Sequence, residues 1–142
     1  MKISIESKTD FDYSVGTEDR FALRKWLERL AVELGRGTVE GLKGFFAEEL
    51  RIEGFTDEDL NREEFLSLIS KWATGDHMIL RYPTLAVNFK HYLFSAVGTF
   101  EGFIDGIIVL EGTIEFKIAK SEEGNFTIVW QKFYPRMLPK SS

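Results

Sequence analysis

Residues 110–118 read Leu-Glu-Gly-Thr-Ile-Glu-Phe-Lys-Ile, so that one set of alternate positions is polar and the other holds the large apolar side chains. Successive side chains of a β-strand point to opposite faces, and a period of two is typical of a strand with one buried face. The stretch therefore predicts a sheet that packs one face on a core while the other face is wet or only partly covered.

The strand pattern continues on both sides of this stretch. β-branched and aromatic residues separated by turn residues predict strands near 78–89, 92–101, 107–119 and 125–134. Residues 120–124, Lys-Ser-Glu-Glu-Gly, have the composition of a tight turn and predict a hairpin between the last two strands.

Helical periodicity precedes the strands. Thr17 has the character of an N-cap and is followed by two acids, which the helix dipole favours. Apolar residues at spacings of three and four then predict an amphipathic helix that ends near Gly35. This apolar stripe consists of Leu23, Trp26, Leu27, Leu30 and Leu34.

A second, weaker helix is predicted to open at Thr38. Its inward residues are expected to be Val39, Leu42, Phe45 and Phe46. Gly41 and Gly44 each cost about 1 kcal/mol relative to alanine in a helix, and close packing is the simplest reason for them. Residues 50–53 alternate again and predict one short strand.

The third predicted helix has the clearest start signal in the chain. Asn61 and Glu64 have the spacing of a capping box, and Leu60 and Phe65 are placed to form a hydrophobic staple. The inward stripe continues through Leu68, Ile69 and Trp72 to Gly75. An α+β fold follows, in which three N-terminal helices pack on the concave face of a curved mixed or antiparallel sheet.

Composition limits the classes of partner. The chain has 142 residues, a formal charge of −5 and no cysteine, so disulfides and thiolate metal sites are excluded and a polyanion would be repelled. The aromatic fraction of 14% suggests a large apolar interior, an apolar pocket or a buried interface. A cytoplasmic protein with no cofactor and no nucleic-acid or membrane partner is expected.

The predicted strand 92–101 carries apolar residues on both faces. Tyr92, Phe94, Ala96 and Phe100 share one face, and Leu93 and Val97 share the other. Three helices cover only one face of an open sheet, so a second copy of the chain is the simplest cover for the other face. The alternative is a central strand that is merely hydrophobic. A homodimer through the sheet is therefore one expectation.

The predicted elements follow the order helix, helix, short strand, helix and then a run of long antiparallel strands. This order, and several segments of the chain, resemble the nuclear transport factor 2-like superfamily, and especially its SnoaL-like branch. Residues 45–54 resemble its junction of second helix and first strand, and residues 61–65 the opening of its third helix. Residues 102–106 are similar to its glycine-bounded turn, and residues 116–130 to its closing hairpin. The resemblance covers roughly residues 17–134 and implies a cone-shaped, cystatin-like roll. Residues 1–16 are then an N-terminal arm and residues 135–142 a tail.

The resemblance also implies where a site lies. Enzymes of this superfamily, including ketosteroid-isomerase-like and polyketide-cyclase-like members, work in an apolar pocket between helices and sheet. The position at which isomerase-like members commonly carry a basic carboxylate is Gly54 here, beside Glu53. If Ile52 faces the core, Glu53 points away from it. Catalysis then requires a one-residue register shift or a base from elsewhere.

Three residues are the catalytic candidates, namely His91, Glu53 and Asp105. An imidazole titrates near neutral pH, although a histidine in a surface turn explains His91 equally. Asp105 and Glu101 flank a predicted turn, where two carboxylates either divide acid and base roles or are simply solvated. The two histidines, His77 and His91, lack the spacing of metal ligands, so no metal site is expected.

Aromatic side chains dominate the predicted pocket. Tyr82, Tyr92 and Trp130 could donate hydrogen bonds to a carbonyl or an oxyanion, with core or interface packing as the alternative for all three. The pocket-lining candidates are Trp26, Phe46, Phe65, Trp72, Tyr82, Phe116 and Trp130. The sequence thus favours an apolar pocket for a small molecule, with isomerase, cyclase or hydrolase activity left open. The alternative is a non-catalytic dimerisation or protein-binding module of the same fold.

Overall fold

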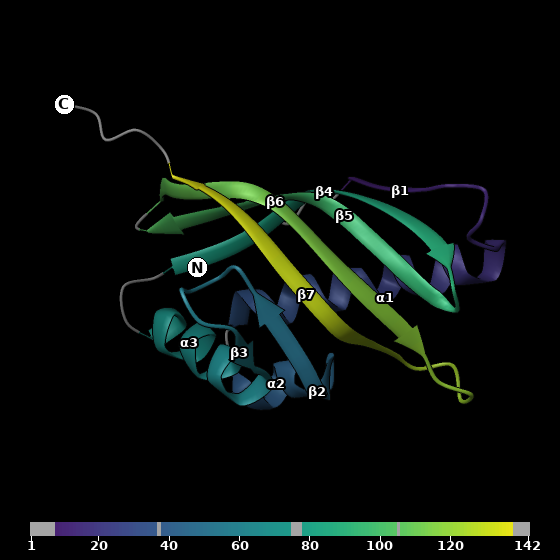
Figure 1. The fold of residues 1–142 in the computed structure, drawn as a ribbon, viewed down its shortest axis with the longest axis horizontal. Coiled ribbons are helices and arrows are strands. Elements are labelled where there is room, and N and C mark those ends of the chain that lie inside the picture. The colour runs from purple at the N-terminus through teal and green to yellow at the C-terminus, as the bar shows by residue number, and fades with distance from the viewer. Residues whose placement is uncertain (1–7, 37, 75–77, 105, 138–142) are drawn as a thin grey trace.

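The computed structural model describes residues 8–36, 38–74, 78–104 and 106–137. Their sheet has the strand order β1-β4-β5-β6-β7-β2-β3, and α1, α2 and α3 pack against it (Figure 1). The predicted α+β class, with three helices on a curved mixed sheet, is confirmed. None of the helices within these residues combines the length and apolarity that crossing a membrane requires.

The long strands form the body of the sheet. They are β4 (Met78–Lys90), β5 (Leu93–Ile104), β6 (Ile107–Lys120) and β7 (Phe126–Met137), each antiparallel to its neighbour. All four predicted strands are confirmed, and β7 extends into the segment expected to be a tail. The predicted turn at 120–124 is confirmed as well, with the backbone N–H of Ser121 bonded to Asn125 at 2.8 Å.

Three shorter strands complete both edges. β2 (Phe46–Glu53) runs parallel to β7, and β3 (Leu60–Asn61) pairs antiparallel with β2. At the opposite edge β1 (Lys8–Phe11) runs parallel to β4, so part of the predicted arm lies in the sheet. Residues 1–7 of the same arm lie outside the described residues.

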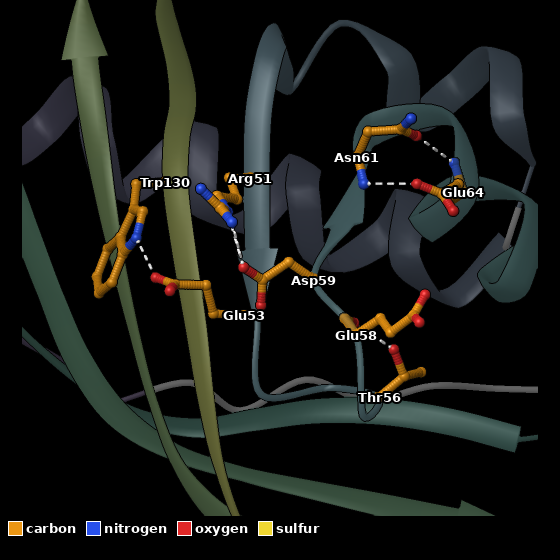
Figure 2. A network of polar contacts seen from close by, with 8 residues as sticks. All are labelled: Arg51, Glu53, Thr56, Glu58, Asp59, Asn61, Glu64 and Trp130. Atoms are coloured by element: carbon orange, nitrogen blue, oxygen red, sulfur yellow. Dashed lines mark hydrogen bonds and ion pairs between the residues drawn. The ribbon is translucent and has the colours of Figure 1, made fainter.

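The helices are α1 (Thr17–Arg36), α2 (Val39–Lys43) and α3 (Arg62–Thr74). Two of them begin directly after their predicted caps, Thr38 and Asn61. Thr17 is instead the first residue of α1, and the carbonyl oxygen of Gly16 before it accepts from the N–H of Arg20 at 2.9 Å. The Thr38 side chain accepts a hydrogen bond from the backbone N–H of Gly41, and Asn61 and Glu64 form a reciprocal capping box at 2.9 and 3.1 Å (Figure 2). These contacts satisfy N–H groups that the first helical turn leaves without partners.

The second helix is shorter than the sequence pattern predicts. It ends at Lys43, so Phe45 and Phe46 are not on its inward face. The backbone oxygen of Phe45 instead accepts from the N–H of Ile128 at 2.8 Å, and Phe46 begins β2 beside β7. A register irregularity between Phe46 and Arg51 hides the period of two in this part of β2. Pairing with β7 therefore overrides the local helical pattern.

The hairpin between β4 and β5 corrects a second expectation. Lys90 pairs with Leu93, and the two residues between them, His91 and Tyr92, have φ angles of 54° and 65°. Two consecutive positive φ angles are typical of a two-residue hairpin turn. Tyr92 is therefore 91% exposed in the turn rather than part of the inward face of β5.

The core lies between the helices and the concave face of the sheet. Phe65 of α3 contacts Phe46 of β2 and Phe133 of β7, with ring centroids 5.7 and 6.3 Å apart. Phe100 of β5 meets Phe133 edge-on at 5.1 Å. Full burial of one such ring contributes about 2–3 kcal/mol. Many of the aromatic residues thus pack helices against strands in the core.

Candidate functional site

The predicted pocket-lining aromatic residues mostly meet in this interior. Phe46, Phe65 and Phe116 are buried, and Tyr82 packs on Phe116 with ring centroids 6.3 Å apart. Trp26 of α1 is buried as well, against Phe45 and Phe126. The side chain of Trp72 lies outside the described part of the chain, although its backbone belongs to α3.

A polar pair lies among these rings. The carboxamide Nε2 of Gln131, on β7, donates to the hydroxyl oxygen of Tyr82, on β4, at 3.5 Å. Gln131 is 1% exposed and Tyr82 is 8% exposed. Burial raises the pKa of the Tyr82 hydroxyl well above its ordinary value, so the group stays neutral at physiological pH. The pair can therefore offer hydrogen bonds without charge.

Gln131 was not among the predicted site residues, and a bulge explains why. Lys117 of β6 pairs with Trp130, but the next residue, Ile118, pairs with Ile128. The extra residue, Val129, reverses which side chains face inward, because alternation restarts after a bulge. Phe126 and Ile128 point inward before the bulge, and Gln131 and Phe133 point inward after it.

The same bulge moves Trp130 to the convex face of the sheet. This corrects its placement in the pocket. Its indole Nε1 donates to the Oε2 oxygen of Glu53 at 2.7 Å (Figure 2). The Lys117 ammonium group lies 5.5 Å from the ring centroid. Trp130 thus has both a hydrogen-bond acceptor and a cation as neighbours on the outer face of the sheet.

Glu53 occupies the outward position that strand alternation predicts. Ile52 is fully buried, and Glu53 extends to the convex face to reach Trp130. Gly54 follows with a φ of 78°, and a Cβ there would lie 2.0 Å from the backbone oxygen of Phe133. A carboxylate side chain at position 54 is therefore incompatible with the β2–β7 contact. The backbone at position 54 thus excludes the carboxylate that isomerase-like members commonly carry there.

The remaining catalytic candidates do not join the polar pair. His91 is exposed in the β4–β5 turn, whereas Asp105 and the other histidine, His77, lie outside the described residues. Besides Tyr82, the described buried residues include two that are polar or charged, Arg62 and Gln131. No group of three potential metal-binding side chains occurs in the described portion.

Arg62 is the buried cation that sequence reasoning missed. Its Nε and Nη2 atoms donate to Glu63 at 3.0 and 2.9 Å, and Nη1 reaches the backbone oxygen of Phe46 at 3.4 Å. The hydrogen bond from Arg62 lowers the pKa of the Glu63 carboxyl. These contacts tie the start of α3 to the start of β2, which is a structural role.

Comparison with known proteins identifies the fold. Neither a protein-family model nor a curated protein sequence matches the chain. A function-unknown protein from Mycobacterium tuberculosis is similar in structure, with a TM-score of 0.72 and 13% identity over 87% of this chain and 79% of that one. A cystatin-like protein of unknown function from Nostoc punctiforme has a TM-score of 0.68 and 12% identity, over 87% and 95%.

A third structural neighbour carries the name of an enzyme. It is a scytalone dehydratase-like protein from Novosphingobium aromaticivorans, with a TM-score of 0.68 and 11% identity over 84% of this chain and 85% of that chain. Designed NTF2 proteins also share the architecture. The chain therefore has the cystatin-like, NTF2-like fold that the resemblance implied. At these identities the likeness shows the fold alone.

Proposed function

We propose, with this NTF2-like fold as the premise, that the domain binds an uncharged, mainly apolar small molecule between its helices and its sheet. Gln131 and Tyr82 would supply the polar contacts of the ligand. The aromatic residues around the pair, Phe116 among them, would supply the apolar contacts.

The observation that carries this proposal is the incomplete hydrogen bonding of Gln131. A primary amide has two N–H donors and a carbonyl acceptor. Here the amide nitrogen makes one bond, at 3.5 Å to Tyr82, and no described side chain bonds the carbonyl oxygen. Leaving a buried polar group without a partner costs about 1–3 kcal/mol. A ligand with a hydroxyl or carbonyl group beside the pair would recover part of that cost.

Binding fits this interior better than acid–base catalysis does. Isomerase, cyclase or hydrolase chemistry needs a group that exchanges a proton near neutral pH. Tyr82 keeps its proton because burial raises its pKa, and the candidates Glu53 and His91 point away from the interior. The scytalone dehydratase-like neighbour supports a small-molecule role, and its name alone does not transfer that reaction.

A ligand screen on variants of the polar pair tests the proposal. Thermal unfolding would be followed with uncharged aromatic ketones and phenols, and with matched carboxylates as charged controls. We expect neutral compounds to raise the melting temperature of the unmodified chain, and Gln131→Leu and Tyr82→Phe to lose most of that shift. The proposal would be contradicted if carboxylates raised the melting temperature more than the neutral compounds did. It would also be contradicted if both variants showed the same shift as the unmodified chain.

Dimerisation through the convex face is the second candidate. Val97 is 40% exposed and Tyr134 is 45% exposed on that face, beside the cross-strand pair of Glu115 and Lys132. In a twofold dimer the same patch of each copy meets, so charges of opposite sign around the apolar residues can pair across the interface. Sedimentation across micromolar concentrations tests this function, with Val97→Lys expected to shift the equilibrium towards monomer. A monomer at every concentration of the unmodified chain would contradict it.

A further inference from the structure

A long groove runs along α1 on the outer surface, away from the Tyr82–Gln131 pair. Its volume is about 1410 Å³. We call it the α1 groove. Its walls come from α1, from α2 and the segment that joins it to β2, and from the β6–β7 turn with the start of β7. Its lining includes Trp26, Lys25, Arg29, Val32, Phe45 and Phe126.

The base of the α1 groove is aromatic. The Trp26 ring lies 5.5 Å from that of Phe45 and 6.1 Å from that of Phe126, centroid to centroid. Trp26 is only 4% exposed, yet its indole N–H donates no hydrogen bond within the described part of the chain. A buried indole N–H normally finds an acceptor. The base of the groove therefore combines an apolar surface with an unused donor.

The rim of the α1 groove has an excess of positive charge. Neither Lys25 nor Arg29 makes an ion pair with a carboxylate among the residues described. Arg36 is paired with Glu33 at 3.1 Å, and a Cβ at Gly41 would lie 2.1 Å from the Glu33 carboxylate. Glu33 thus lies beside α2, and its carboxylate is already paired with Arg36.

Of the groove's acids, Glu28 remains beside Lys25 and Arg29, two cations that no described carboxylate pairs with. The Lys25 ammonium group lies over the Phe21 ring, 4.4 Å from its centroid, which leaves its charge uncompensated by an acid. The rim is therefore locally basic on a chain whose formal charge is −5. Because opposite charges steer association and set orientation, a partner with carboxylates fits this rim best.

The dimensions favour a peptide over a small molecule. Ala22 and Arg36 both line the groove, and their separation of fourteen positions corresponds to about 21 Å along a helix axis. Small-molecule pockets usually enclose about 300–1,000 Å³. An open groove of this length matches the way an amphipathic helix lies against a partner. Val32, 53% exposed on the rim, extends the apolar surface.

We propose that the α1 groove docks an acidic, amphipathic segment of another protein, with apolar side chains over Trp26 and carboxylates facing Lys25 and Arg29. The segment would bind as a helix alongside α1. This interaction is independent of the ligand proposed for the interior, because the two sites share no polar contact.

Fluorescence anisotropy with defined peptides tests the docking proposal. The probe is a fluorescein-labelled 16-residue helical peptide with leucines along one face and glutamates elsewhere. Its controls are the same peptide with lysine for every glutamate, and a version with the leucines scattered. We expect the acidic amphipathic peptide to bind at least about tenfold more tightly than either control. Raising the salt concentration should weaken it, since exposed charges are screened.

Matched variants locate the contact. Arg29→Glu should weaken the acidic peptide about tenfold, and Lys90→Glu, the same charge reversal at the exposed end of β4, should leave its affinity within about twofold. Val32→Glu should weaken binding by removing an apolar contact and adding an acid. Equal affinity for Arg29→Glu and the unmodified chain would overturn the proposal. Tighter binding of the lysine peptide would also overturn it. So would binding of dodecanoate, a fatty-acid anion used as a small-molecule probe of the α1 groove, without binding of the acidic peptide.

Discussion

Trp130 and Gln131 are neighbours on β7 that face opposite sides of the sheet, and their surroundings contrast. Trp130, the more apolar residue, lies outward, where Glu53 accepts its N–H bond and Lys117 approaches its ring. Gln131, the more polar residue, lies inward with one long bond to Tyr82. The comparison teaches that the outer face completes its own polar contacts, whereas the interior keeps hydrogen-bonding capacity for a partner.

The largest expected effect is at the β2–β7 contact, which holds both faces in place. Gly54→Ala should lower the free energy of unfolding by about 3 kcal/mol or more, because a Cβ meets the Phe133 oxygen at 2.0 Å and the φ of 78° is strained for alanine. Urea unfolding measures the change. Gly124→Ala is the matched control, since its φ is 86° but nothing lies within 4 Å of the added Cβ. It should cost about 1 kcal/mol.

The next effect tests the outer side of the comparison. Glu53→Ala removes the acceptor of the Trp130 indole N–H and should cost about 1 kcal/mol of unfolding free energy. Glu49→Ala, at an exposed position of the same strand, should stay within about 0.5 kcal/mol of the unmodified chain. If both variants unfold at the same urea concentration, the Trp130 contact contributes no stability.

A smaller effect is expected on the inner side. Gln131→Leu should be neutral or slightly stabilising in urea unfolding, because it replaces an incompletely bonded buried amide with an apolar group of similar size. Ile114→Ala, which removes buried volume on β6, should cost about 2–5 kcal/mol and shows that the interior is sensitive to packing. A loss above about 2 kcal/mol for Gln131→Leu would mean that the interior already satisfies this amide.

The smallest effect is a pH dependence at the start of α3. The hydrogen bond from Arg62 lowers the pKa of Glu63 in the folded state below its ordinary value of 4.5. Its contribution is therefore present above pH 4.5 and is lost as the pH falls through the lowered pKa. Unfolding curves between pH 3 and pH 7 should show that the free energy of unfolding falls slightly more steeply towards acid pH for the unmodified chain than for Glu63→Gln. Identical profiles would contradict this contribution.

Local patterns predicted most of the fold. The capping box of Asn61 and Glu64 is observed as predicted, and the alternation of residues 110–118 marks the inward face of β6. Such signals depend on neighbours within a few positions, so the sequence contains them. The end of α2 was not predictable in this way, because Phe45 and Phe46 leave the helix to pair with β7, which follows about 80 positions later.

The candidate site was less predictable for the same reason. Phe46, Phe65, Tyr82 and Phe116 were recognised because large aromatic residues in amphipathic elements are usually buried. The sequence analysis placed Trp130 in the interior and did not identify Gln131 as an inward residue. No residue type in this segment indicates the bulge between Ile128 and Trp130. Only the inward position of Phe133 two residues later could have indicated that Gln131 shares its face.

The amino-acid sequence by itself determined the order and type of the three helices and the four long strands, and most of the aromatic core, because periodicity and capping are local properties. The tertiary structure decided which face each side chain of β7 presents, since the bulge depends on pairing with β6. It also decided that position 54 must be glycine, because the Phe133 backbone lies against it. The α1 groove likewise exists only once α1, the α2–β2 segment and the β6–β7 turn meet in space.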